Sequence, residues 1–166
     1  MSVATPASGR LAMAFGAFAL AMIGGALAFQ YIGGYPPCEM CHWQRWPHIA
    51  AAIIGLGGGL ALQMGLIRRR YAAAIALVVL ALIAVSGLIG VYHAGVEWKW
   101  WAGPTACTGS AFRIGAGGLD LSTKVVMCDR AAWRLFGISM AGYNALLSIG
   151  AAIFGSIIVS NTRKLR

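Results

Sequence analysis

The sequence predicts an all-α membrane protein, a bundle of four transmembrane helices joined on one side of the bilayer by two cysteine-bearing loops. Of its 166 residues, 60% are hydrophobic and only 10% are charged, and the mean hydropathy is +0.76. A water-soluble domain carries about 25% charged residues. The chain therefore has too little polar surface to cover a globule in water, which disfavours an unusually apolar soluble protein.

Four uncharged stretches support this fold, at residues 11–32, 49–67, 71–92 and 138–160. Each is long enough to cross a hydrocarbon core as a helix, because only a helix satisfies all backbone groups of one segment in lipid. We expect one domain over 1–166, with helices near 11–32, 46–67, 71–92 and 136–160 and outer loops at 33–45 and 93–135. The first stretch could be a cleaved signal peptide, but it is longer than the usual apolar region and only Arg10 precedes it.

The distribution of basic residues predicts the orientation. Seven of the thirteen stand at positions 10, 68–70, 163, 164 and 166, with no acidic residue among them. Short segments rich in Lys and Arg stay in the cytoplasm. We therefore expect both termini in the cytoplasm and both loops outside, which is the periplasm for a bacterial inner-membrane protein. The net charge of +9 is then explained by topology, and no nucleic-acid partner is expected.

Small and polar residues within the stretches predict helix packing. Gly55 and Gly59 form a ridge of small residues in the second helix, and Ser86, Gly87 and Gly90 line the third. Such residues allow close backbone approach in membranes. Asn144 in the fourth helix is expected to hydrogen-bond a neighbouring helix.

The second loop is too apolar to be fully solvated. Trp98, Trp100 and Trp101 are typical of the lipid–water boundary. We expect part of this loop to lie on the membrane surface, with a short helix beginning near Ser122, and a mobile section at the glycines 115, 117 and 118.

Four cysteines carry the chemistry. Cys38 and Cys41 form a Cys-x-x-Cys motif in the first loop, and Cys107 and Cys128 lie in the second. Four cysteines permit three connectivities; the motif pair is close enough to join to itself, which leaves Cys107 with Cys128. A thiol–disulfide relay, two structural disulfides and a four-cysteine zinc site all remain open. Zinc is disfavoured because the second pair is widely spaced, and we expect no metal.

Basic residues near the motif favour the relay. Arg45 follows Cys41 by four residues and would lie on the same helix face, where a cation lowers a thiol pKa. His93 would end the third helix at a similar depth. Arg45 and His93 together could hydrogen-bond the carbonyl oxygens of a quinone in the bilayer. His42 and His48, which flank Arg45, are interpreted as tolerated polar residues.

These residues resemble the bacterial disulfide bond formation protein B (DsbB) family. The resemblance spans about 37–144. It rests on Pro37-Cys38-Glu39-Met40-Cys41-His42-Trp43-Gln44-Arg45; on Tyr92-His93-Ala94-Gly95-Val96-Glu97 with Trp101, Pro104 and Cys107; and on Cys128, Trp133, Ser139-Met140-Ala141 and Tyr143-Asn144.

The resemblance implies an inner-membrane enzyme that reoxidises a periplasmic DsbA-like dithiol oxidase and passes two electrons to ubiquinone or menaquinone. It implies that Cys107 takes the partner's attack, that Cys128 then attacks Cys38, and that Cys41 faces the quinone. Arg45 would stabilise that thiolate or the quinone anion, with His93 near the ring. The stretch between Cys107 and Cys128 is shorter than in better-known members, so its surface helix and partner preference can differ.

Two other functions remain. A vitamin K epoxide reductase-like enzyme is also a small helical bundle with cysteines, but its Cys-x-x-Cys is expected near the last helices, whereas here it opens the second. A non-catalytic membrane scaffold with stapled loops would give the same cysteine count. A staple should resist mild reduction, which a catalytic pair should not.

Overall fold

The computed structural model describes residues 7–108, 113–115, 118–120 and 126–164. Four long helices dominate it: α1 (Ala7–Tyr31), α2 (Glu39–Gln63), α3 (Ala72–Glu97) and α4 (Met140–Lys164). The short 3-10 helix η1 (Arg69–Tyr71) joins α2 to α3. Two small hairpins, β1–β2 (Arg113–Gly115 and Gly118–Asp120) and β3–β4 (Arg134–Leu135 and Ile138–Ser139), lie between α3 and α4.

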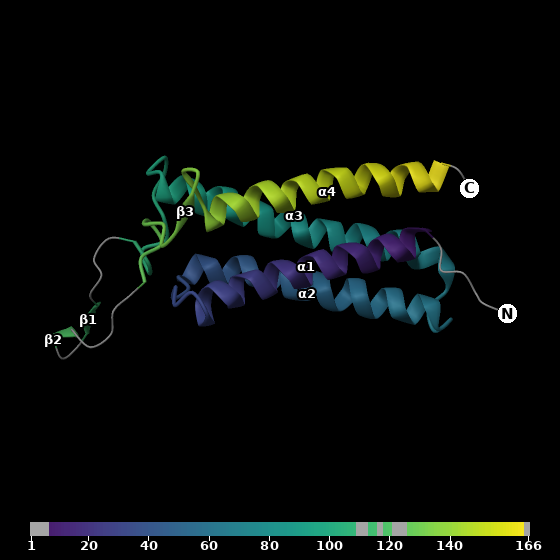
Figure 1. The fold of residues 1–166 in the computed structure, drawn as a ribbon, viewed down its shortest axis with the longest axis horizontal. Helices are drawn as coiled ribbons and strands as arrows, with labels where there is room; N and C mark the ends of the chain where they lie inside the picture. Colours follow the sequence, from purple (N-terminus) through teal and green to yellow (C-terminus); the bar gives the residue numbers. More distant parts are fainter. Residues whose placement is uncertain (1–6, 109–112, 116–117, 121–125, 165–166) are drawn as a thin grey trace.

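The four helices run side by side along one long axis (Figure 1). The start of α1, the α2–α3 connection and the end of α4 lie together at one end, and both cysteine-bearing connections lie at the other, here called the cysteine end. Within the described residues, three helical segments are long and apolar enough to cross a membrane: Gly9–Tyr31, Arg69–Glu97 and Met140–Thr162. The chain is thus a helical, multi-pass membrane protein, and α2 falls short because its first turns are polar.

The helices do not end where the apolar stretches end. α2 begins at Glu39, before the expected 46, and α3 continues to Glu97, past the expected 92. α4 begins at Met140, after the expected 136, because the chain first forms the β3–β4 hairpin. Helix limits are set by backbone capping, whereas an apolar run marks only the part that suits lipid. Several turns at the cysteine end are therefore helical but polar.

The second loop contains strands that the sequence did not suggest. β1 pairs antiparallel with β2, with Arg113 opposite Asp120, and β3 pairs with β4, with Arg134 opposite Ser139. A two-residue turn joins β3 to β4, where Phe136 and Gly137 both have positive φ, 49° and 81°. Such turns need residues that tolerate left-handed backbone, which Gly137 supplies. The expected surface helix near Ser122, and Gly117, lie outside the described residues.

Glycines set the distance between paired helices. A Cβ on Gly55 of α2 would lie 2.6 Å from the carbonyl oxygen of Ala12 and 2.7 Å from the Cα of Gly16 in α1. In the other pair, a Cβ on Gly90 of α3 would lie 3.0 Å from the carbonyl oxygen of Ala141 in α4. Backbones approach this closely only where side chains are absent, which is how membrane helices gain packing contacts.

We predict that Gly55→Ala lowers thermal stability in detergent, because the added methyl group would overlap α1 backbone that cannot move away. The expected loss is about 1–3 kcal/mol, as for other overpacked sites. Gly57→Ala is the matched control, since a Cβ there meets nothing within 4 Å. Equal unfolding temperatures for the two variants would contradict this account of the α1–α2 contact.

Candidate active site

The Cys-x-x-Cys motif forms the beginning of α2. Cys38 is the N-cap residue, and its Sγ accepts a hydrogen bond from the backbone N–H of Cys41 at 3.2 Å. The preceding Pro36-Pro37 cannot extend a helix backwards, so the chain enters in an extended form. Both sulfurs therefore lie where backbone N–H groups and the positive end of the helix dipole favour a thiolate.

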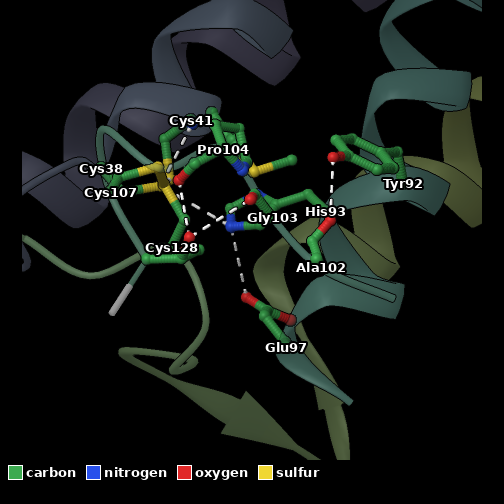
Figure 2. The surroundings of a disulfide bond; sticks show 12 residues. Cys38, Cys41, Tyr92, His93, Glu97, Ala102, Gly103, Pro104, Cys107 and Cys128 are labelled. Carbon is green, nitrogen blue, oxygen red and sulfur yellow. Dashed lines mark hydrogen bonds and ion pairs between the residues drawn. A yellow bond between two sulfur atoms is a disulfide. The ribbon is translucent and has the colours of Figure 1, made fainter. Parts of the chain in front are cut away.

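All four cysteines lie together at the cysteine end of the bundle. Cys107 and Cys128 are joined by a disulfide, and Cys38 and Cys41 are free thiols whose sulfurs are 2.7 Å apart. Cys38, Cys107 and Cys128 are buried in one apolar cluster, and Cys41 packs against it. Figure 2 shows the disulfide directly beside the dithiol. Thiol–disulfide exchange requires a thiolate to reach a disulfide sulfur, and this cluster brings the groups together.

The two thiols of the motif differ in acidity. Cys41 lies in the first turn of α2, before the apolar part of that helix. The hydrogen bond from Cys38 lowers the pKa of the Cys41 thiol, and the charge of Arg45 lowers it further. The same hydrogen bond, together with burial, raises the pKa of the Cys38 thiol. Once the pair is reduced, Cys41 is therefore the more acidic of the two thiols.

His93 of α3 lies against Cys38, and its proton can be placed from its neighbours. The Gln44 side-chain Nε2 donates to the carbonyl oxygen of Met40 at 3.2 Å and lies 2.8 Å from His93 Nδ1. An amide nitrogen only donates, so His93 Nδ1 is the acceptor and Nε2 carries the hydrogen. That N–H faces Cys38 Sγ at 3.6 Å and Glu97 Oε1 at 3.7 Å.

The hydrogen bonds continue from Gln44 into the centre of the bundle. Asn144 Nδ2 of α4 donates to Gln44 Oε1 at 2.8 Å and to the carbonyl oxygen of Ser86 at 3.1 Å. Asn144 Oδ1 therefore faces the other way, 3.0 Å from His48 Nε2 and 2.9 Å from Ser148 Oγ, which donates to it. Buried polar groups need partners, and this network ties α2, α3 and α4 together.

A cavity of about 420 Å³ lies beside the motif. Apolar residues of α1, of α4 and of the two connections at the cysteine end form most of its lining, with Cys41, Arg45 and His48 of α2 among its polar groups. Small-molecule sites are typically apolar cavities of about 300–1,000 Å³ with a few placed polar groups. Arg45 is held at the wall by α1, since its guanidinium donates to Gln30 Oε1 at 2.6 Å.

Aromatic side chains that line this cavity bridge α1 and α4. Phe29 of α1 packs against Tyr35 and, edge to face, against Trp133, and Trp133 packs against Tyr143 of α4. All four residues line the cavity. Aromatic pairs of this kind add packing energy beyond simple burial. They connect α1 to α4 at the level of the cysteines.

The donor atoms of Cys38, Cys41 and His93 lie within 4.8 Å of one another. Two thiolates and an imidazole are a set that soft metals accept. The same three residues also suit disulfide exchange, so this geometry alone does not separate the two kinds of site.

Comparison with known proteins favours disulfide exchange. A sequence profile described as "Disulfide bond formation protein DsbB" matches residues 8–158. The chain belongs to the DsbB family. It is therefore a membrane oxidoreductase of disulfide-bond formation, and members of this family use quinones. It is also 30% identical to the uncharacterized protein RP370 of Rickettsia prowazekii (strain Madrid E), over 78% of this chain and 75% of that protein. No solved structure matches the chain.

The structure brings the six site residues chosen from the DsbB-like sequence to the cysteine end. Cys38, Cys41, Arg45 and His93 line the cavity, and the Cys107–Cys128 disulfide packs beside it. Both nitrogens of His93 already have neighbours, so it faces Cys38 more directly than the cavity. Their roles stay predictions.

Sequence reasoning gave no role to Gln44 and treated His48 as merely tolerated. One signal was present: Gln44 and His48 are four residues apart, as are Asn144 and Ser148. Residues at this spacing share a helix face, so two polar pairs within apolar helices could have been matched to each other.

We predict that Arg45→Met raises the pKa of Cys41, because the variant removes a cation that lowers it. The thiolate fraction at neutral pH then falls, and the midpoint of the alkylation rate of Cys41 with iodoacetamide moves to higher pH. The rate is measured by mass spectrometry in a Cys107→Ser/Cys128→Ser background. Arg69→Met, at the far end of the bundle, is the control. An unchanged pH profile in Arg45→Met would contradict the electrostatic role of Arg45.

Proposed function

We propose that this DsbB-family protein oxidises a soluble, periplasmic, DsbA-like dithiol protein and delivers the two electrons to a membrane quinone. The observation that carries the proposal is the contact of two cysteine pairs beside an apolar cavity. The disulfide lies on the long connection between α3 and α4, at the end of the bundle that a soluble partner would approach. The motif lies at the cavity, where a lipid-soluble oxidant can reach it.

The exchange starts from the state in which Cys38 and Cys41, like Cys107 and Cys128, are joined by a disulfide. The partner thiolate attacks Cys107, and the Cys107–Cys128 bond breaks to release the Cys128 thiolate. Cys128 attacks Cys38, and the bond to Cys41 breaks. The partner's second thiolate displaces Cys107, which completes the partner disulfide. Cys107 then attacks Cys128 and displaces Cys38, which restores the loop disulfide and leaves Cys38 and Cys41 reduced.

The quinone returns the motif to its disulfide state. Two electrons pass from the Cys38–Cys41 dithiol to the quinone ring, a disulfide forms, and the ring takes up two protons as hydroquinone. Arg45 at the cavity wall would stabilise the Cys41 thiolate and negative charge on the ring oxygen. His93 Nε2–H would donate toward Cys38 Sγ and hold it in place for the attack by Cys128. The net reaction converts a partner dithiol and a quinone to a partner disulfide and a hydroquinone.

The membrane placement follows from the same proposal. α2 runs antiparallel to the flanking spans α1 and α3, so we propose that it is the fourth span, despite its polar first turns. The basic residues of the α2–α3 connection then stay in the cytoplasm with both termini. The cysteine end faces the periplasm of a bacterial inner membrane, where thiols are oxidised.

The contact between cysteine pairs also bears on the rival functions. A stapled scaffold gives no reason for a free dithiol packed against a disulfide at a cavity. A vitamin K epoxide reductase-like enzyme is disfavoured by the position of the motif at the start of α2 and by the family match over residues 8–158.

We predict that purified protein reduces a water-soluble ubiquinone or menaquinone analogue when fed with a reduced DsbA-like donor. Cys41→Ser and Cys107→Ser should each abolish turnover, because each removes a sulfur that the electrons must pass. The measurement is the quinone absorbance against time. Activity that survives in Cys107→Ser would exclude the relay order given above.

A trapping experiment tests the first step by itself. A donor that keeps only its attacking cysteine should accumulate as a mixed disulfide with wild-type protein, because no second donor thiol can resolve it. The adduct should be absent with Cys107→Ser and present with Cys41→Ser, which is the matched control. Adduct mass after proteolysis identifies the joined cysteine. An adduct at Cys38 would instead show that the partner attacks the motif directly.

A further inference from the structure

We propose that His48 is a binding residue of the cavity, and that its Nδ1 accepts a hydrogen bond from a hydroxyl group of the bound hydroquinone. This inference rests on the proposed function and names the group that recognises the product. Nothing in the sequence motif of the cysteines points to His48, which lies three residues beyond Arg45 on α2.

The first observation is an unsatisfied nitrogen. His48 is 3% exposed, and its Nδ1 has no hydrogen-bond partner among the described residues. Leaving a buried polar atom unpaired is costly, so such atoms usually have a reason. His48 also lines the cavity. A ligand in the cavity can therefore supply the missing partner.

The second observation fixes the chemistry of that nitrogen. Asn144 Nδ2 faces only acceptors, Gln44 Oε1 and two atoms of Ser86, so Asn144 Oδ1 faces His48 Nε2. A carbonyl oxygen only accepts, which places the hydrogen of neutral His48 on Nε2. His48 Nδ1 is then a lone pair without a hydrogen. This nitrogen can accept a hydrogen bond from a hydroxyl group, but it carries no hydrogen that it could donate to a carbonyl oxygen.

This distinction selects between the two redox forms of one ring. A quinone presents two carbonyl oxygens, which only accept, and a hydroquinone presents two hydroxyls, which also donate. Neutral His48 therefore favours the hydroquinone. A purely structural role would use only Nε2, which meets Asn144, and would leave the buried Nδ1 without a partner.

The geometry places this acceptor apart from the cysteines. Three residues along a helix correspond to a rise of about 4.5 Å, so His48 lies deeper in the bundle than Arg45. Arg45 is directed toward α1, where it bonds Gln30, whereas His48 is directed toward α4, where it meets Asn144. One oxygen of a ring can thus lie near Cys41 and Arg45 while the opposite oxygen lies near His48.

The test compares two isosteric variants. His48→Gln puts an amide near the position of Nε2, which preserves the bond to Asn144 but removes Nδ1. His48→Asn puts an amide near the position of Nδ1, but its shorter side chain loses the hydrogen bond to Asn144. Dissociation constants for a water-soluble ubiquinone analogue and for its hydroquinone are measured by tryptophan quenching. A Cys38→Ser/Cys41→Ser background prevents electron exchange with the ring.

We predict that His48→Gln weakens hydroquinone binding by about five- to tenfold, as expected for loss of one hydrogen bond, and changes quinone binding little. His48→Asn should keep most of the hydroquinone affinity while lowering the unfolding temperature. His42→Gln, an exposed histidine on the same helix, is the control. Equal weakening of both ring forms by His48→Gln, or no weakening of either, would overturn the proposal.

This binding experiment does not depend on turnover. If hydroquinone binding depends on His48 but the wild-type protein cannot oxidise a donor, the proposed function is contradicted and the binding site is retained. If the wild-type protein turns over but the hydroquinone affinity is unchanged in His48→Gln, the proposed function is retained and the role of His48 is contradicted.

Discussion

The side chain of Asn144 is the contact on which the arrangement of this bundle depends. It lies among α2, α3 and α4, and each of its two amide atoms is used. In lipid there is no water to replace a missing partner, so a half-satisfied amide at this depth would be expensive. Asn144 therefore fixes how α2 is rotated, and that rotation decides which α2 side chains face the cavity.

The hydrogen bonds on both sides of Asn144 share one direction. His48 donates to Asn144, Asn144 to Gln44, and Gln44 to His93, whose remaining N–H faces Cys38. Bonds aligned in this way polarise one another in a low-dielectric interior. The chain thus connects the cavity wall at His48 to the sulfur of Cys38 without any ionised group. Amides do not readily pass protons, so its effect is orientation and polarisation.

Much of the fold could be predicted because lipid imposes simple rules. Length and hydropathy of the uncharged stretches locate four helices, and three of them meet the criteria for a span. The polar turns of α2 could not be placed this way, because Cys38 caps a helix that begins before the apolar residues do. The β3–β4 hairpin was also missed, since its turn depends on two residues, Phe136 and Gly137, rather than on a long pattern.

The candidate site could also be predicted from the sequence only in part. Cys38, Cys41 and Arg45 are neighbours in sequence, so their proximity follows from helical spacing alone. The contact of Cys107 and Cys128 with the motif depends on how the long connection folds back, which no local pattern encodes. His48 was undervalued because a lone histidine near a membrane boundary carries little information. Its meaning comes from a partner that is 96 residues away in the sequence.

These parts fit a thermodynamic requirement of the proposed reaction. A dithiol protein that oxidises others strongly is itself hard to reoxidise, because its reduced form is the stable one. An acceptor site can help by stabilising its own reduced states. Two features of this chain would do so in the proposed reaction: the hydrogen bond from Cys38 and the charge of Arg45 lower the pKa of the Cys41 thiol, and the lone pair of His48 would favour the hydroquinone. Both lie on the same three turns of α2, the helix that Asn144 holds in rotation. The bundle therefore places both groups on one helix, at the wall of one cavity.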